Sequence, residues 1–190
     1  FTAFLEDLKG KREPPRAYSM SSAPHERYLA VTVKEERYVS GATKYPPLLS
    51  PFLVHHPLKG AKMEVTGYAG GYYLPEDIAS RTDHVVHLCA GSGSVPNVSM
   101  IKWGLAHEPK LRQTFIYSNK TWNDVIYRDE LTRMEAAHPG RLKVIHALTR
   151  EPESFAYSDA VRRGRVTPDL IREMAGDVAA CYFFACGPAV

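Results

Sequence analysis

The stretch Cys89-Ala90-Gly91-Ser92-Gly93-Ser94-Val95-Pro96 stands between an apolar run and a segment with helical periodicity. The run before it, residues 83–89, has the length and composition of a buried strand. After it, Val98, Ile101 and Leu105 recur on one helix face, and the proline that closes the stretch suits a first turn. Glycines in such a turn let the backbone approach a ligand, and the following helix N-terminus offers unpaired N–H groups. The stretch predicts a strand, a phosphate-binding turn and a helix, with a plain tight turn as the alternative.

The turn departs from three better-known glycine motifs. Pro96 stands where a G-x-G-x-x-G fingerprint has its third glycine, and the Lys-Ser/Thr pair of a P-loop is absent. The G-x-S-x-G spacing of a nucleophile elbow is also missing around Ser92 and Ser94, which disfavours a hydrolase.

Strand-like and helix-like segments continue to alternate after this turn. Apolar residues in helical register, including Val125, Ile126, Leu131 and Met134, predict a helix, and Thr167-Pro168-Asp169 has the form of another helix start. The expected strands of this part are 83–89, 113–118, 142–148 and 181–185. Such alternation predicts an α/β domain with a doubly wound parallel sheet.

The first 80 residues have a different rhythm. Short alternating runs at 16–20, 28–34 and 63–66 are separated by turn residues, and Pro46, Pro47, Pro51 and Pro57 exclude a long helix between them. We expect an antiparallel β-barrel over 1–80 and the α/β domain over 81–190, with the boundary near residues 75–82.

Composition limits the class of protein. The 190 residues carry 24 Lys and Arg against 21 Asp and Glu, a net charge of +3, which is too small to indicate nucleic-acid binding. The basic run Arg162-Arg163-Gly164-Arg165 is expected to be a solvated loop, with a phosphate contact as the weaker alternative. Three cysteines make no disulfide framework, and neither a signal peptide nor an apolar run of ~20 residues is present. We therefore expect a cytoplasmic protein with reduced thiols.

The ends of the sequence favour a fragment. The chain starts without Met inside a strand-like run, and it stops two residues after Gly187-Pro188. We expect an incomplete barrel at the start and a truncated α/β domain at the end.

Two further phrases carry polar chemistry. In Arg16-Ala17-Tyr18-Ser19, strand alternation places the arginine and the tyrosine on one face, where they can pair with a diphosphate and lie against an aromatic cofactor. The alternative is an edge strand with surface polar residues. Cys186-Gly187-Pro188 follows the last expected strand, at the edge where open α/β sheets bind ligands. A structural cysteine is the alternative there.

The three phrases in this order resemble the ferredoxin-NADP reductase family, and the chain looks most similar to the reductase components of oxygenases. The resemblance implies an FAD-binding barrel followed by an NAD(P)-binding domain. It also implies that NAD(P)H gives a hydride to FAD and that single electrons pass to an iron–sulfur protein or domain. The rival interpretation is a flavin- or nucleotide-binding electron-carrier or sensor subunit without NAD(P)H turnover.

The resemblance also implies roles for individual residues. Ser19, beside the flavin N5, and Cys186, beside the nicotinamide, are the expected catalytic residues. The expected FAD contacts are Arg16, Ala17, Tyr18, Ser19, Thr32, Val33, Lys34, Gly41 and Ser50, with a Tyr- and Pro-rich insertion separating the last two. The expected dinucleotide contacts are Gly91, Ser92, Gly93, Val95, Pro96, Cys186, Gly187 and Pro188.

The residues after the second α/β strand bear on the choice between NADPH and NADH. Ser118, Asn119, Lys120 and Arg128 offer groups for a 2′-phosphate, which favours NADPH slightly, although Asp124 and Asp129 lie nearby. We expect no metal site. An iron–sulfur cluster needs four thiolates, and the chain has three cysteines.

Overall fold

The centre of the protein is a five-stranded parallel sheet with strand order β4-β3-β2-β1-β5. The structure is a computed structural model that describes residues 16–35, 49–56, 59–60, 65 and 67–188. Its strands are β1 (His84–Ala90), β2 (Arg112–Asn119), β3 (Leu142–Leu148), β4 (Val161–Arg163) and β5 (Tyr182–Cys186). The strand order reverses beside β1, which is the position where open α/β sheets bind ligands. The predicted doubly wound sheet is confirmed.

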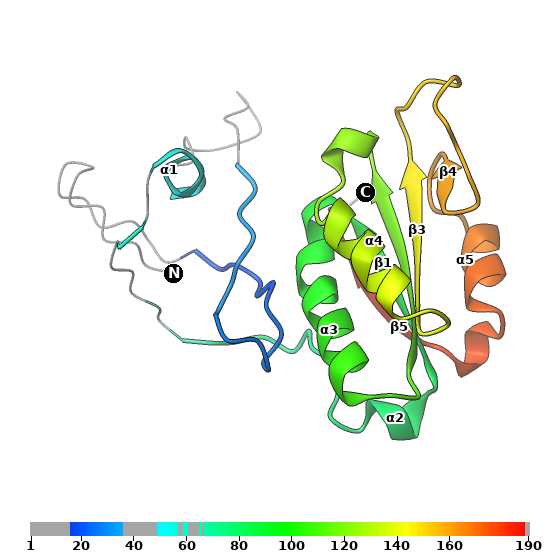
Figure 1. Cartoon of the computed structure of the whole chain (residues 1–190), viewed down its shortest axis with the longest axis horizontal. Coiled ribbons are helices and arrows are strands. Elements are labelled where there is room, and N and C mark those ends of the chain that lie inside the picture. Colours follow the sequence, from blue (N-terminus) through cyan, green and yellow to red (C-terminus); the bar gives the residue numbers. More distant parts are fainter. Residues whose placement is uncertain (1–15, 36–48, 57–58, 61–64, 66, 189–190) are drawn as a thin grey trace.

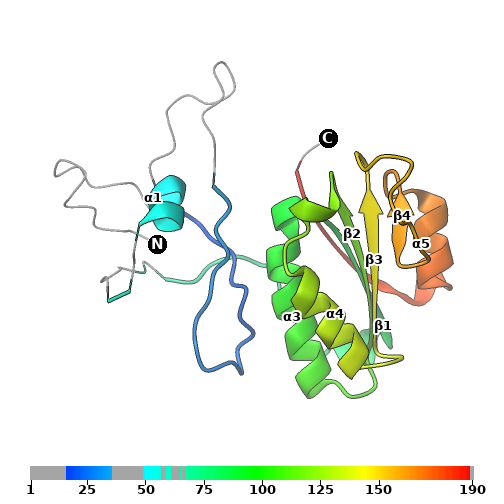
Figure 2. The same cartoon turned by 45° about the horizontal axis from the view of Figure 1, so that its top comes forward.

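Helices cover both faces of the sheet. Figures 1 and 2 show α3 and α4 on one face and α5 on the other. The α-helices are α1 (Leu49–His55), α2 (Ile78–Arg81), α3 (Ser94–His107), α4 (Arg128–Ala137) and α5 (Pro168–Ala175), and the 3₁₀ turns are η1 (Gly91–Gly93), η2 (Trp122–Asp124) and η3 (Val178–Ala180). Among the described residues, none of these helices has the length and apolar character needed to cross a membrane.

Burial on both faces explains why β1 reads as a nearly continuous apolar run. Val85 and Cys89 pack on the α3 and α4 side, while Val86 packs against residues of α5. The intervening His87 is also fully buried. A central parallel strand covered on two sides needs such a sequence.

The ends of two helices follow local sequence chemistry. The Thr167 side chain accepts a hydrogen bond from the Leu170 amide at 3.2 Å, so the predicted N-cap of α5 is confirmed. The helix predicted from residue 125 onwards begins only at Arg128. Thr121 and Asp124 form a capping box that gives η2 its own short turn, and Tyr127 then adopts φ 62° before α4 starts. Val125 and Ile126 therefore lie outside the helix.

The basic run at 162–165 is only in part the solvated loop that we expected: Arg163 and Arg165 are exposed, but the run begins in a strand. Arg162 and Arg163 belong to β4, which pairs with β3 from His146 to Leu148. Their side chains lie at the sheet edge and pair with Glu173 at 2.8 Å and Glu153 at 2.7 Å. The charges of Arg162 and Arg163 are therefore paired with acidic side chains from neighbouring segments.

Residues 16–35, the longest described stretch of the N-terminal part, lack the regular strands that the alternating runs predicted. In residues 16–35 the structure has a single antiparallel bridge, between Met20 and Val31, in place of strands at 16–20 and 28–34. Tyr28 and Leu29 are 70% and 73% exposed, so the alternating pattern buries little apolar surface. A lone pair of strands without a packed face is marginal. The expected run at 63–66 lies almost entirely outside the described residues. The barrel and the domain boundary stay predictions.

Segment 16–35 contacts the α/β part through α3 and Tyr127. The Ser99 hydroxyl donates to the Ser22 carbonyl at 2.8 Å, and the Tyr127 and Thr32 hydroxyls form a hydrogen bond. Lys102 of α3 pairs with Glu26 at 3.4 Å. Figure 2 shows this segment beside α3.

Candidate nucleotide-binding site

The glycine turn lies at the carboxyl edge of the sheet, between the end of β1 and the start of α3. Gly91 has φ +53°, a left-handed conformation, and an added Cβ there would meet nothing within 4 Å. The Tyr117 hydroxyl of β2 donates to the Gly91 carbonyl at 2.9 Å. The turn is therefore open to solvent on the side of the Gly91 Cα, while the Gly91 carbonyl is held by Tyr117.

The structure brings the glycine turn and the Cys-Gly-Pro phrase together. A Cβ added to Gly93 would come within 2.2 Å of the Cys186 carbonyl oxygen, and one added to Gly187 would come within 3.0 Å of the Ala90 Cβ. Strands β1 and β5 run in register here, with Cys89 opposite Cys186. Two phrases almost a hundred residues apart therefore form one surface where the strand order reverses.

The start of α3 fits an anionic group. The helix has 14 residues, its first turn contains no acidic residue, and no side chain caps it. Ser92 is exposed beside it, Val95 is buried beneath it, and Pro96 is partly buried in the first turn. The Ser94 N–H is already bonded to the Gly91 and Ser92 carbonyls, and Pro96 has no N–H, so the feature of this end that favours a phosphate is the helix dipole.

Cys186 has the properties of a packing group. Burial raises the pKa of its thiol, and burial also raises the pKa of the neighbouring Cys89 thiol. Both thiols therefore keep their protons at neutral pH, whereas a nucleophilic cysteine needs a lowered pKa. Cys186 can shape the site sterically, but it is not an activated nucleophile.

The end of β2 contributes the next residues of this edge. Ser118 lies opposite Ala90 in the strand register, Asn119 is buried, and Lys120 is exposed. Gly187 and Pro188 are also exposed at the end of β5. Ser118, Lys120 and the glycine turn thus belong to one edge of the sheet.

Two charged residues near this edge already have local partners. The Asp124 carboxylate accepts hydrogen bonds from the Thr121 amide at 3.0 Å and from its hydroxyl at 2.8 Å. These bonds are the main cause that lowers the pKa of Asp124. The Arg128 guanidinium lies 5.5 Å from the centre of the Trp122 ring. Neither group faces the edge unpartnered. The charge of Lys120 also contributes to the lowered pKa of Asp124, so the lysine lies near that carboxylate.

The expected flavin residues occupy the N-terminal part. Arg16, Ala17 and Ser19 are exposed, and Tyr18 packs beside Leu49 of α1. The remaining members are Thr32 and Val33, which are partly buried, Lys34, which is exposed, and Ser50, which is buried in α1. Gly41 lies outside the described residues. The FAD roles of these residues stay predictions.

Sequence reasoning missed several residues that support the site from below. His87, Asn97 and Gln113 are buried polar side chains between the sheet and α3, and Tyr72 and Tyr117 donate hydrogen bonds near the turn. The available signal was a polar residue within an apolar pattern: His87 alternates with Val85 and Cys89 in the central strand.

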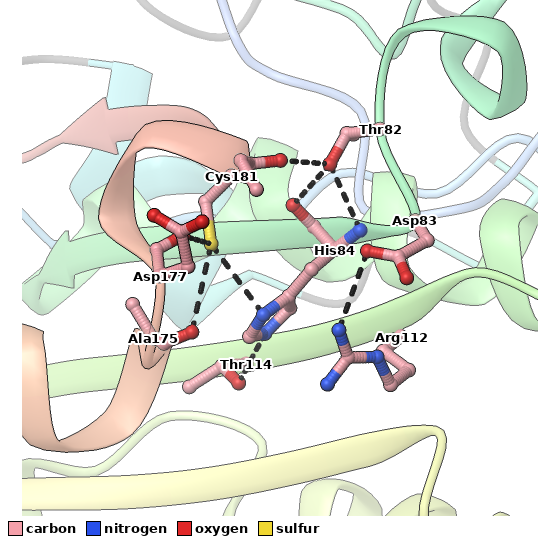
Figure 3. A network of polar contacts seen from close by, with 9 residues as sticks. Thr82, Asp83, His84, Arg112, Thr114, Ala175, Asp177 and Cys181 are labelled. Atoms are coloured by element: carbon pink, nitrogen blue, oxygen red, sulfur yellow. Dashed lines mark hydrogen bonds and ion pairs between the residues drawn. The ribbon is translucent and has the colours of Figure 1, made fainter.

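A second polar cluster lies at the opposite, amino edge of the sheet (Figure 3). The Cys181 thiol lies 3.5 Å from His84 Nδ1 and 3.3 Å from the Asp177 carbonyl, and His84 Nε2 lies 2.8 Å from the Thr114 hydroxyl. Burial raises the pKa of Cys181 and lowers that of His84, so both are neutral near pH 7. The cluster joins β1, β2 and the start of β5.

The two edges are too far apart for one metal centre. Cys181 precedes β5 and Cys186 ends it, so about five residues of extended chain, roughly 16 Å, separate their Cα atoms. They cannot ligate the same iron–sulfur cluster. Within the part of the chain that the structure describes, no group of three or more His, Cys, Asp or Glu side chains could hold a metal ion.

Comparison with known proteins agrees with this geometry. The sequence profile of the family described as "Oxidoreductase NAD-binding domain" matches residues 88–190. NADH-cytochrome b5 reductase 1 of Bos taurus is 36% identical over 87 residues, 45% of this chain and 27% of the relative. Nitrate reductase [NADH] 1 of Zea mays is 29% identical over 153 residues, 74% of this chain and 24% of the relative. The chain thus spans about a quarter of each relative.

Solved structures share the fold. A ferredoxin-NADP+ reductase of Plasmodium falciparum, the H286L mutant with 2′P-AMP, aligns with a TM-score of 0.67 and 19% identity over 98% of this chain and 70% of that one. The flavohem-like FAD/NAD binding domain of nitric oxide dioxygenase from Vibrio cholerae aligns with a TM-score of 0.61 and 18% identity over 91% of this chain and 77% of that one.

The profile match begins within β1 and includes both the glycine turn and the Cys-Gly-Pro phrase, the two parts that the structure brings together. The chain belongs to the oxidoreductase NAD-binding domain family.

Proposed function

We propose that the protein is an NAD(P)H-dependent flavin oxidoreductase in which the carboxyl edge of the sheet binds the nicotinamide dinucleotide. The observation that carries the proposal is the close approach of Gly93 to the Cys186 carbonyl, beside the uncapped N-terminus of α3. This arrangement supplies the positive end of the α3 dipole for a pyrophosphate and a neutral thiol at the neighbouring strand end.

The residues of this edge have separate tasks in the proposed reaction. Gly91 and Gly93 keep side chains away from the pyrophosphate, while the positive end of the α3 dipole attracts its charge. Cys186, which remains protonated, holds the nicotinamide sterically and takes no proton from it. The chain therefore contributes binding and orientation at this edge.

The N-terminal part supplies a donor set that suits FAD. An exposed guanidinium at Arg16 can pair with a diphosphate, and the exposed Ser19 hydroxyl can donate to a ring nitrogen. Bound FAD supplies the conversion between hydride transfer and single-electron transfer. The Ser19 hydroxyl would orient the ring, and Tyr18 would bind its face.

For the nucleotide we propose a slight preference for NADPH. Lys120 is exposed directly after β2, beside Ser118, and the nearby Asp124 carboxylate is held by Thr121. An ammonium group favours a 2′-phosphate over a free ribose hydroxyl. The names of the bovine and maize relatives carry NADH, so NADH is the competing donor.

For the electron acceptor we propose an iron–sulfur protein or a fused iron–sulfur domain, as in the reductase component of an oxygenase. The support is the resemblance of the three phrases to such components. The bovine relative is named for cytochrome b5, which makes cytochrome b5 the competing acceptor. Reduction assays with a plant-type ferredoxin and with cytochrome b5, run side by side, separate the two.

The test of the activity is an anaerobic titration of the FAD-loaded protein with NADPH and, separately, with NADH. We expect the oxidised flavin band at about 450 nm to disappear after one equivalent of the preferred nucleotide. A protein that binds FAD but is bleached by neither nucleotide would instead be an electron carrier or sensor. A protein that takes up no flavin would refute the FAD assignments of Arg16, Tyr18 and Ser19.

A further inference from the structure

Three polar side chains are buried between the sheet and α3, close below the glycine turn. His87 of β1 and Asn97 of α3 have no exposed surface, and Gln113 of β2 is 1% exposed. Their neighbours on this face, including Val98 and Ile101, are apolar. Burying polar groups costs free energy unless each is hydrogen-bonded. The hydrogen bonds of this trio of side chains therefore show which parts of the structure they hold in place.

Asn97 connects the trio directly to the turn. Its Nδ2 donates to the Gly93 carbonyl at 2.9 Å. Its Oδ1 accepts from the Tyr72 hydroxyl at 3.1 Å and lies 2.9 Å from His87 Nδ1. Gly93 lies so close to Cys186 that an added Cβ would be 2.2 Å from the Cys186 carbonyl oxygen. One amide side chain therefore fixes the part of the turn that meets the last strand.

His87 determines how Asn97 is oriented. Burial lowers the pKa of His87 to about 4, so the ring is neutral at pH 7 and carries one N–H. Its nitrogens face two oxygens, Asn97 Oδ1 at 2.9 Å and Gln113 Oε1 at 3.2 Å. A neutral ring can donate to only one of these oxygens, and we assign Nδ1, which makes the shorter contact, as the donor. The Phe184 ring, stacked at 5.7 Å and 17°, holds the imidazole plane.

Tyr72 reaches the trio from the segment before α2. Its ring packs edge-on against Phe184 at 5.5 Å, and its hydroxyl donates to Asn97. Burial, the largest cause, raises the pKa of Tyr72 to about 12, so the phenol keeps the proton that it donates. Asn97 Oδ1 thus receives donors from β1 and from the chain before the sheet.

We propose that Asn97 is a positioning residue for the nicotinamide dinucleotide. Held by His87 and Tyr72, it fixes the Gly93 carbonyl and keeps the glycine turn against Cys186 in the shape that receives the pyrophosphate. The inference rests on the proposed function and extends it to residues below the site. Gln113 belongs to the same trio, but it bonds to the Ile101 carbonyl, in the middle of α3, and not to the turn.

This difference supplies a matched pair of variants, Asn97→Leu and Gln113→Met. Each removes one buried amide that faces His87, so both are expected to lower the melting temperature. Only Asn97→Leu removes the hydrogen bond to Gly93. We expect it to raise the dissociation constant for the preferred nucleotide about tenfold, the effect of one lost buried hydrogen bond, and Gln113→Met to change it less than about twofold. At saturating nucleotide, kcat should change little while KM rises.

A second readout needs no nucleotide. Hydrogen–deuterium exchange of residues 91–96 should accelerate in Asn97→Leu and stay at the wild-type rate in Gln113→Met. If Asn97→Leu does not fold, Tyr72→Phe, which removes one hydroxyl from a side chain 39% exposed, should weaken nucleotide binding about threefold.

The outcomes separate this inference from the function on which it rests. Equal nucleotide affinities and equal exchange in Asn97→Leu and Gln113→Met, with a wild type that binds NAD(P)H, would overturn the positioning role alone. If Tyr72→Phe is the variant measured, an unchanged dissociation constant would overturn it. A wild type that binds neither NADPH nor NADH would overturn both the proposed function and the positioning role.

Discussion

Gly93 and Cys186 approach so closely that a Cβ on Gly93 would lie 2.2 Å from the Cys186 carbonyl oxygen. Gly93 ends the turn η1 that follows β1, and Cys186 ends strand β5, yet the two residues form a single surface. Backbone lies against backbone here, so neither side can move aside as a flexible side chain would. The proposed nucleotide site includes this contact.

Replacing Gly93 with Ala should therefore push the glycine turn away from the end of β5. We expect a loss of stability of about 1–3 kcal/mol from overpacking and a large loss of NAD(P)H affinity, both measurable by thermal unfolding and calorimetric titration. Gly71→Ala is the control, because an added Cβ there meets nothing within 4 Å and φ is not in the left-handed region. Wild-type affinity in Gly93→Ala would show that the contact is not needed for binding.

Stability should fall as the pH drops from about 6.5 to about 4. Burial lowers the pKa values of His87 and His146 from 6.5 to about 4, so in this window the unfolded chain binds protons that the folded chain excludes. Urea unfolding at pH 7, 6, 5 and 4 measures the slope. His84, whose pKa burial also lowers, contributes in the same direction. In His146→Phe, one of these proton-binding groups is gone and the slope should be smaller. A slope equal to that of the wild type would argue against a buried neutral His146.

Lys120→Ala should reduce the preference for NADPH over NADH. Loss of an exposed ammonium near a 2′-phosphate is expected to weaken NADPH binding a fewfold and to leave NADH binding unchanged, because only NADPH carries that phosphate. Lys110→Ala is the matched control, since Lys110 is an exposed lysine before β2, at the other edge of the sheet. If both variants keep the wild-type ratio of dissociation constants, Lys120 does not select the nucleotide.

Arg16→Ala should weaken flavin retention, because the guanidinium is the expected partner of the FAD diphosphate. The FAD content after gel filtration measures the effect. Arg27→Ala serves as the control, since Arg27 is exposed in the same segment and lies over the Tyr28 ring.

Ser19→Ala should retain FAD and slow its reduction in stopped-flow measurements. Full FAD retention in Arg16→Ala, or an unchanged reduction rate in Ser19→Ala, would remove that residue from the site.

The α/β part could be predicted because its signals are local. Strands β1, β2 and β3 are mostly buried, and β5 is an apolar run even though it is only partly buried at the sheet edge. The Thr167 cap is written in three consecutive residues. Strand β4 escaped prediction because Val161, Arg162 and Arg163 become a strand only through pairing with β3. Their sequence alone has the charge of a surface loop.

The N-terminal part shows the opposite failure. Residues 28–34 alternate like a strand, but Tyr28 and Leu29 are exposed, and only the Met20–Val31 bridge forms in the described segment. A pattern with period two needs a packed face to become a sheet. The trio of His87, Asn97 and Gln113 was missed for a related reason: its members lie far apart in sequence, and tertiary packing alone brings them together.

The most direct test of the nucleotide site is an NMR titration of the ¹⁵N-labelled protein with NADPH and NADH, which follows every assigned backbone amide. The account predicts that the largest shift changes occur at residues 91–95 and at Cys186 and Gly187. Smaller shift changes should occur at Ser118 and Lys120. The amide signals of residues at the opposite edge, such as His84 and Cys181, should keep their positions. Binding that shifts the amino edge or segment 16–35 while the glycine turn stays unchanged, or no binding of either nucleotide, would contradict the account.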